Sequence, residues 1–327
     1  MRDLEGRIAV VTGGGSGMGR ELVDQLGSAG VHVATCDVDR EGLDETRERA
    51  VRHAPSGTVI STFVADVSDG QQVLAFRDSV ASAHETEHLH LLFNNAGIGG
   101  AGSFVVDDRA EWDATFAVCW GGVYNCTRAF LPMLLAAEEG HVVNTSSVNG
   151  FWASLGPTIA HSAYSTAKFA VKGFTEALVT DFRLNAPHLR ASVVMPGHIG
   201  TSIVMNSGRY HGRSPKDLTQ EQVAQIREQL DRQGIETSGA SDEDIRQGAQ
   251  AQAELFRDAA PMNAADAAAV IIDGVRNDRW RILVGHDAEL LDRLVREAPE
   301  DAYEPSFTQR LQRGGAFNFT GPTSPPE

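Results

Sequence analysis

The sequence predicts a doubly wound α/β fold, in which one parallel sheet carries helices on both of its faces. Three observations lead to this prediction. Short apolar runs alternate with longer amphipathic segments, a glycine-rich loop directly follows the first run, and polar residues stand where later runs end. Near-continuous apolar strands that alternate with helices are typical of a parallel sheet buried on both faces.

The strand-sized apolar runs follow one another in a regular order. They cover residues 8–11, 31–34, 59–64, 89–93, 141–144 and 191–195, and the last of them ends at Pro196-Gly197. The pattern returns as a helix over 264–275, a strand over 281–284 and a helix over 287–296. We therefore expect the 327 residues to form a single domain over 1–303.

A polar insert over about 206–260 interrupts the alternation. Two helices are predicted inside it, opening at Thr219 and Ser241, because each of these residues is followed three positions later by a side chain that can complete a cap. The first of these helices has a thin apolar stripe, enough to lie on a surface but not to form a core. The stripe consists of Val223, Ile226 and Leu230.

The last stretch, residues 304–327, has a different composition. It is rich in Gly, Pro, Ser and Thr. We expect it to form a C-terminal arm that is partly extended or disordered.

Charge and cysteine content exclude several classes of function. A formal net charge of −16 argues against sequence-independent binding of nucleic acid, which needs a basic surface. The three cysteines, Cys36, Cys119 and Cys126, show no paired spacing, so neither a disulfide framework nor a metal site is predicted, and a cytoplasmic location is expected. No apolar run approaches membrane-spanning length, and the charged first residues leave no room for a signal peptide.

The glycine-rich loop over 12–19 has the composition of a phosphate site. Its glycines let backbone amides approach a phosphate, and the helix that follows adds unpaired N–H groups and the positive end of its dipole. Such a loop alone could be a plain turn. Its place between the first strand and the first helix favours dinucleotide binding.

Acidic and amide residues follow the next strands. Asp37 ends the second strand, where a carboxylate can accept both ribose hydroxyls of an adenosine and would repel a 2′-phosphate, so NAD is favoured over NADP. Asp37 could instead be a helix N-cap. Asp66 could accept from an adenine amino group and Asn94 could join neighbouring strands, although either could be an ordinary turn residue.

Tyr164 and Lys168 form a pair that could do proton chemistry. Their spacing of four residues places a phenol and an ammonium on one face of a predicted helix. Taken alone, such a pair is usually a set of surface neighbours.

Together these motifs resemble those of the short-chain dehydrogenase/reductase family. The matching elements are TGxxxGxG over 12–19, NNAG over 94–97, the strand-end Ser147, YxxxK over 164–168, and Pro196-Gly197 with Thr201. The resemblance covers residues 5–205 continuously and 264–284 less specifically. It implies a Rossmann-type fold and reversible hydride transfer between a nicotinamide and an alcohol or carbonyl.

The resemblance also implies roles for individual residues. Tyr164 would be the general acid/base, Lys168 would lower its pKa and hold the nicotinamide ribose, and Ser147, rather than Ser146, would donate to the substrate oxygen. The implied cofactor contacts are Gly13, Ser16, Gly17, Met18, Gly19, Asp37, Asp66, Val67, Asn95, Ala96, Gly97, Tyr164, Lys168, Pro196, Gly197, Ile199 and Thr201. An ammonium about 4 Å from the phenol is worth roughly three pKa units at an effective dielectric near 20, which would bring Tyr164 near neutrality in a dry site.

Cys119 departs from the family pattern. It stands where the family usually has a catalytic Asn that holds a water of the proton relay, and a thiol is a weak hydrogen-bond partner. We favour a tolerated variant with another water path. The alternative is a catalytically weak or silent NAD-binding sensor or scaffold.

The substrate side is expected to be apolar. In the resemblance, the segment after Pro196-Gly197 is a substrate lid, here extended to about 201–262, and the loop between Ser147 and Tyr164 is enlarged. The expected pocket residues are Phe151, Trp152, His198 and Met205. They suggest a lipophilic secondary alcohol or its ketone, although they could equally be packing residues.

Two helices have more apolar surface than one sheet can cover. They are predicted over 108–136 and 163–184 and carry apolar residues on more than one face. In the family such helices form subunit interfaces, so a homodimer or homotetramer is expected.

Overall fold

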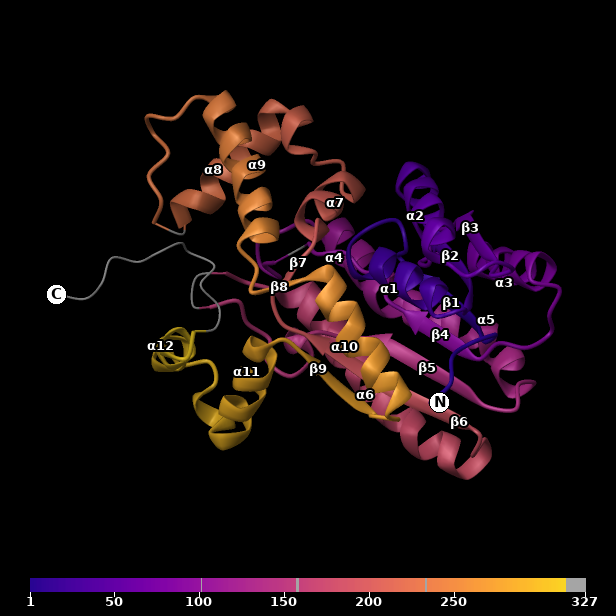
Figure 1. Cartoon of the computed structure of the whole chain (residues 1–327). Helices are drawn as coiled ribbons and strands as arrows, with labels where there is room; N and C mark the ends of the chain where they lie inside the picture. Colours follow the sequence, from indigo (N-terminus) through magenta and orange to yellow (C-terminus); the bar gives the residue numbers. More distant parts are fainter. Residues whose placement is uncertain (101, 157–158, 233, 316–327) are drawn as a thin grey trace.

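A seven-stranded parallel sheet forms the centre of the molecule (Figure 1). The computed structural model describes residues 1–100, 102–156, 159–232 and 234–315. The strand order is β3-β2-β1-β4-β5-β6-β9, and each neighbouring pair is parallel. The strands are β1 (Ile8–Thr12), β2 (His32–Asp37), β3 (Ile60–Val64), β4 (Leu91–Asn94), β5 (Gly140–Thr145), β6 (Leu189–Pro196) and β9 (Arg281–Val284). The predicted doubly wound fold is confirmed.

Helices cover both faces of this sheet, and each face has its own apolar core. One core includes Leu26 and Ile271 and lies under α1 (Gly17–Ser28), α2 (Arg40–His53) and α10 (Ala264–Arg276). The other includes Phe76 and Phe130 and lies under α3 (Gly70–Ala83), α5 (Gly122–Leu135) and α6 (Ser162–Asn185). The strands are buried from both sides, which explains their almost continuously apolar sequences.

The helix before α5 contains a local irregularity. The chain runs from α4 (Arg109–Phe116) through one π-helical turn, η1 (Ala117–Gly121), directly into α5. Cys119 lies in this turn. Single π-helical turns occur often at functional sites.

The lid, the insert expected over about 201–262, begins and ends at one pair of short strands. Short strands β7 (Ile199–Gly200) and β8 (Met262–Asn263) pair with each other and bracket α7 (Ile203–Tyr210), η3 (Pro215–Asp217), α8 (Gln220–Arg232) and α9 (Asp242–Asp258). Both predicted caps are present, since Thr219 exchanges hydrogen bonds with Gln222, and Ser241 with Asp244. The lid helices stand at one end of the sheet, in orange in Figure 1.

The apolar stripe of α8 is buried, although it was predicted only to lie on a surface. Val223 is buried together with Leu218 and Ile245, and Ile226 and Leu230 pack against them. The stripe therefore forms a small core, because α9 covers it.

The C-terminal arm begins as a helix, so the expectation of an extended segment is wrong for its first part. After α11 (His286–Glu297) and η4 (Pro299–Asp301), residues Pro305–Arg313 form α12. Phe307 and Leu311, one turn apart, are both buried, and Phe307 contacts Trp152. This apolar pair gives the helix a face to bury, which outweighs the turn-forming composition. Residues 316–327 of the expected arm lie outside the described residues.

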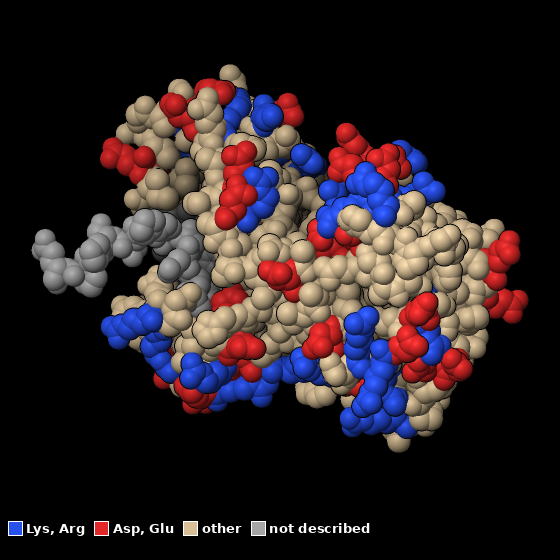
Figure 2. Space-filling model, viewed as in Figure 1, with Lys and Arg blue, Asp and Glu red and all other residues tan. Residues whose placement is uncertain are grey.

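Acidic and basic side chains are interspersed on the face of the molecule in Figure 2. Among the helices in the described part of the chain, none combines the length and the apolar character needed to cross a membrane.

Candidate active site

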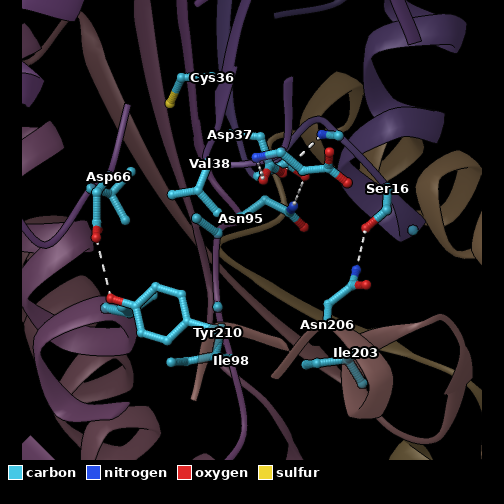
Figure 3. Close-up of a pocket in the computed structure, with 18 of the residues that line it drawn as sticks. Ser16, Cys36, Asp37, Val38, Asp66, Asn95, Ile98, Ile203, Asn206 and Tyr210 are labelled. Atoms are coloured by element: carbon cyan, nitrogen blue, oxygen red, sulfur yellow. Dashed lines mark hydrogen bonds between the residues drawn. The ribbon is translucent and has the colours of Figure 1, made fainter. Parts of the chain in front are cut away.

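A cleft of about 530 Å³ opens where the carboxyl ends of β1 and β4 meet (Figure 3). The chain order of the strands reverses at this point, and open α/β sheets bind ligands at such a point. The predicted residues that line the cleft are Gly13, Ser16, Gly17, Met18, Asp37, Asp66, Val67, Asn95, Ala96, Gly97 and Thr201. The fold thus brings together residues that the sequence spreads over about two hundred positions.

The glycine loop is shaped by positions that only glycine suits. Gly13 and Gly17 have φ angles of 71° and 53°, in the left-handed region. A Cβ on Gly14 would lie 1.9 Å from the hydroxyl of Thr35, so the loop packs directly on β2. Ser16 is the N-cap residue of α1 but its side chain makes no capping hydrogen bond, which leaves the first N–H groups of α1 open to a ligand.

Asp37 is held at the end of β2 by backbone N–H groups. Its Oδ2 accepts from Gly15 N at 2.9 Å and its Oδ1 from Asp39 N at 3.1 Å. Burial raises the pKa of the Asp37 carboxyl, and these hydrogen bonds oppose the rise. Asp39, not Asp37, caps α2. The N-cap explanation for Asp37 is therefore wrong, and its carboxylate faces the cleft.

Two more strand ends complete the sheet side of the cleft. Asn94 is buried and donates to Asn144 Oδ1 at 2.8 Å. This hydrogen bond joins β4 to β5, as expected for a residue that links neighbouring strands. Asp66 Oδ1 accepts from Ser68, and its Oδ2 accepts from the hydroxyl of Tyr210 at 3.2 Å. The predicted adenine partner is thus already in contact with the lid.

Tyr164, Lys168 and Ser147 meet just beyond the inner end of the cleft. Lys168 is buried, its Nζ donates to Thr145 O at 2.9 Å, and Nζ lies 5.3 Å from the centre of the Tyr164 ring. A side-chain hydrogen bond links Tyr164 with Ser147. Ser146 donates instead to Lys168 O at 2.7 Å, which supports the choice of Ser147 as the reactive serine.

Gly97 connects this trio with the cleft. It lines the cleft, and a Cβ on it would lie 3.4 Å from Lys168 Nζ. The ammonium therefore lies next to a residue of the cleft wall.

Comparison with known proteins agrees with this geometry. The family model described as short chain dehydrogenase matches residues 7–211. The chain belongs to the short-chain dehydrogenase family.

Three relatives illustrate how far the similarity extends. The oxidoreductase SadH of Mycobacterium tuberculosis is 33% identical over 321 residues, 98% of each chain. A short chain dehydrogenase/reductase from Burkholderia phymatum, solved in complex with NAD, is 28% identical with a TM-score of 0.72 and covers 99% of this chain and 100% of its own. Levodione reductase of Leifsonia aquatica is 34% identical over 205 residues, 62% of this chain and 72% of its own.

The pKa of Tyr164 differs from the expectation. Burial raises it above its usual value, the nearby Cys119 raises it further, and the hydrogen bond with Ser147 opposes the rise. Burial also lowers the pKa of the Lys168 ammonium. The dry surroundings that strengthen the attraction between ammonium and phenolate also deprive both charges of hydration, and here that loss dominates.

Cys119 lies close to Gly97, and so to Lys168. It is buried in the π-helical turn η1, and its thiol donates to Ile98 O at 3.1 Å. The Cβ position of Gly97 that approaches Lys168 Nζ lies 3.7 Å from Cys119 Sγ. The thiol therefore borders the reactive pair.

The expected substrate-pocket residues mostly hold the structure together. Trp152 is 2% exposed, donates to Ala302 O at 2.7 Å and contacts Phe307. His198 contacts Phe256 of α9 through its ring and Nε2. Neither residue is among those that line the cleft, and each has a partner distant in sequence, so their assignment to a substrate pocket stays a prediction.

Phe151 and Met205 are not among the residues that line the cleft either. Phe151 packs against the core around Trp152 and α11, with Arg281 over its ring. Met205 turns towards Gln250 of α9. Phe151 thus joins the enlarged loop to the C-terminal elements, and Met205 joins two helices of the lid.

Four of the expected cofactor residues support the cleft without lining it. They are Gly19, Pro196, Gly197 and Ile199. A Cβ on Gly19 would lie 2.0 Å from Gly13 O, so Gly19 lets α1 approach the loop, and Ile199 is buried in the β7–β8 pair.

Sequence reasoning missed one face of α7 and one histidine. Ile203, Asn206, Arg209 and Tyr210 line the cleft from the lid side, and only their position shortly after Thr201 could have suggested it. The His161 ring contacts the Tyr164 ring in a tilted arrangement, with 4.8 Å between ring centres. Burial lowers the pKa of His161 to about 4, so its imidazole is neutral at pH 7.

Proposed function

We propose that the protein is an NAD-dependent oxidoreductase that interconverts a lipophilic secondary alcohol and its ketone. The observation that carries the proposal is the continuity of the cleft. It extends from Asp37 at the end of β2 to Gly97, beside which Lys168 and Tyr164 lie.

The residues of the cleft fit a nicotinamide dinucleotide. The left-handed Gly13 and Gly17 and the open N-terminus of α1 suit a diphosphate, and a volume of about 530 Å³ is within the range of cofactor sites. The Asp37 carboxylate suits the ribose hydroxyls of NAD and repels the 2′-phosphate of NADP. When bound, the cofactor supplies the hydride acceptor or donor.

The chain's own residues handle the substrate oxygen and its proton. The Ser147 hydroxyl donates a hydrogen bond to that oxygen and orients it. Tyr164 O–H gives its proton to the oxygen as a ketone is reduced, and the phenolate takes the proton back as an alcohol is oxidised. Lys168, fixed by Thr145 O, stabilises the phenolate and holds the nicotinamide ribose.

Aromatic side chains beside the reactive trio support a lipophilic substrate. Trp112 stacks on Phe116 with 5.4 Å between ring centres, and Phe104 lies at 6.2 Å from Trp112. The Trp112 indole N–H donates to Ser162 at the start of α6, which brings this cluster close to His161. The name of one relative, levodione reductase, agrees with carbonyl chemistry.

We propose further that the protein is a homo-oligomer. Tyr124 of α5 and Phe169 and Leu184 of α6 expose 49%, 42% and 76% of their surface, so these helices keep apolar area on the outside. Other apolar residues of the same helices, Val123, Phe130 and Leu178, are buried in the core. The free, buried cysteines suit a cytoplasmic location.

One screen tests the function. Wild-type protein is assayed with a panel of lipophilic secondary alcohols and ketones in the presence of NAD(H) or NADP(H), beside the Tyr164→Phe variant. We expect turnover with NAD(H), and a loss of at least about a thousandfold in the variant, with NADH affinity unchanged within about twofold.

Two results would count against the proposal. Undiminished turnover in Tyr164→Phe would reject the proton role of Tyr164. Tight NADH binding without turnover of any panel member would favour the silent NAD-binding protein that Cys119 had suggested.

A further inference from the structure

The lid brings one cation to an otherwise acidic cleft. Among the described residues that line it, the acidic ones are Asp37, Asp39, Glu41 and Asp66. The one Lys or Arg in the same set is Arg209 of α7. An anionic dinucleotide that enters this cleft is repelled by the carboxylates unless a cation compensates for them.

The Arg209 guanidinium is available for this task. Its side chain is exposed, and within the described part of the chain it makes no hydrogen bond or ion pair. Other arginines nearby are engaged: Arg20 pairs with Glu45, and Arg213 pairs with Glu111.

Hydrogen bonds to both sides of the cleft fix the helix turn that carries Arg209. Asn206 Nδ2 donates to Ser16 Oγ at 2.9 Å, and Tyr210 O–H donates to Asp66 Oδ2 at 3.2 Å, on opposite sides of the cleft in Figure 3. Ser16 is the residue that precedes α1, at whose N-terminus the diphosphate is expected. Arg209 stands three residues after Asn206 and next to Tyr210, so it belongs to the turn that spans the cleft.

We infer that Arg209 binds the diphosphate of the dinucleotide, and that the lid therefore supplies part of the cofactor affinity. The inference rests on the proposed function. The planar fork of a guanidinium matches two phosphate oxygens at once. The diphosphate is favoured over a ribose 2′-phosphate because the Asp37 carboxylate repels the latter.

Fluorescence titrations with NADH and NADPH test the inference without any assay of turnover. The Arg209→Gln variant is compared with wild type and with Arg232→Gln, which makes the same charge change on lid helix α8, away from the cleft. We expect the Kd for NADH to rise about tenfold in Arg209→Gln and to stay unchanged in Arg232→Gln. Arg209→Lys should restore part of the affinity. The loss of affinity with added salt should be steeper for wild type than for Arg209→Gln.

The outcomes separate this inference from the proposed function. Wild-type protein that binds neither dinucleotide would overturn both. Wild-type binding of NADH with an equal Kd in Arg209→Gln would overturn the Arg209 assignment alone. A loss confined to NADPH would also overturn it, because Arg209 would then contact a 2′-phosphate.

Discussion

The two walls of the cleft are built in different ways. The strand-end wall, which consists of the loops after β1 to β4, is fixed by the sheet itself. Gly13 N donates to Cys36 O at 2.8 Å, and Thr12 Oγ1 accepts from both Asn95 N and Ala96 N at 3.0 Å. The lid wall is the face of α7 that includes Asn206, Arg209 and Tyr210. It meets the strand-end wall through side-chain hydrogen bonds of Asn206 and Tyr210, through hydrogen bonds of Ser207 and His211 with Gly99, and through packing of Tyr210 on the core.

This contrast indicates that the two walls have different roles. The strand-end wall is preorganised, because each loop starts from a buried strand. The lid wall can separate from it when a few polar contacts break, and such regions open locally at low free energy. We propose that the first wall defines where the dinucleotide lies and that the second controls its entry and release.

The buried contact between the loop after β5 and the C-terminal helix α12 should show the largest effect. Trp152→Ala removes a buried indole that contacts Phe307 and donates to Ala302 O. We expect the free energy of unfolding to fall by about 3–5 kcal/mol in urea titrations. Trp152→Phe, which keeps a ring but loses the N–H, should lose about 1 kcal/mol. If the stability is unchanged and the KM for substrate rises, Trp152 contacts the substrate instead of supporting the fold.

The pH profile distinguishes the two directions of the reaction. Because burial raises the pKa of Tyr164 above its usual value, the phenolate needed for alcohol oxidation is a minor species at pH 7. Its fraction grows about tenfold per pH unit below the pKa, so oxidation should accelerate roughly a hundredfold from pH 7 to 9. Ketone reduction starts from the protonated phenol and should stay nearly constant. A plateau of oxidation already above pH 7 would show that Lys168 outweighs burial.

Asp37 tests the strand-end wall. Asp37→Asn keeps an oxygen that can accept from Gly15 N but removes the charge. We expect the Kd for NADH to rise about tenfold while NADPH binding is unchanged or tighter, measured by fluorescence titration. Asp44→Asn on the exposed side of α2 is the matched control. Equal losses for NADH and NADPH would mean that Asp37 only shapes the glycine loop.

The sequence was most informative where the fold determines the position of a residue. Parallel strands end at one edge of a sheet, so a carboxylate after β2 and an amide after β4 must converge. Asp37 and Asn95 could therefore be predicted without coordinates. The glycine loop was predictable for the same reason, since it links β1 to α1.

Loop residues were harder, because partners far along the chain decide where their side chains lie. Trp152 donates to the carbonyl of Ala302, 150 residues away along the chain, and the ring of His198 contacts Phe256 of α9. A local pattern holds no information on such partners. The helix α12 did have a signal, the spacing of Phe307 and Leu311, which the composition of the surrounding stretch concealed.

Hydrogen exchange with and without NADH tests the division between the two walls most directly. At saturating NADH the amides of α7, Ile203–Tyr210, should exchange markedly more slowly, because the dinucleotide holds the lid wall closed. The amides of β1 and β4, already fixed by the sheet, should change little. An unchanged exchange rate in α7, or equal slowing in α7 and these strands, would contradict the account.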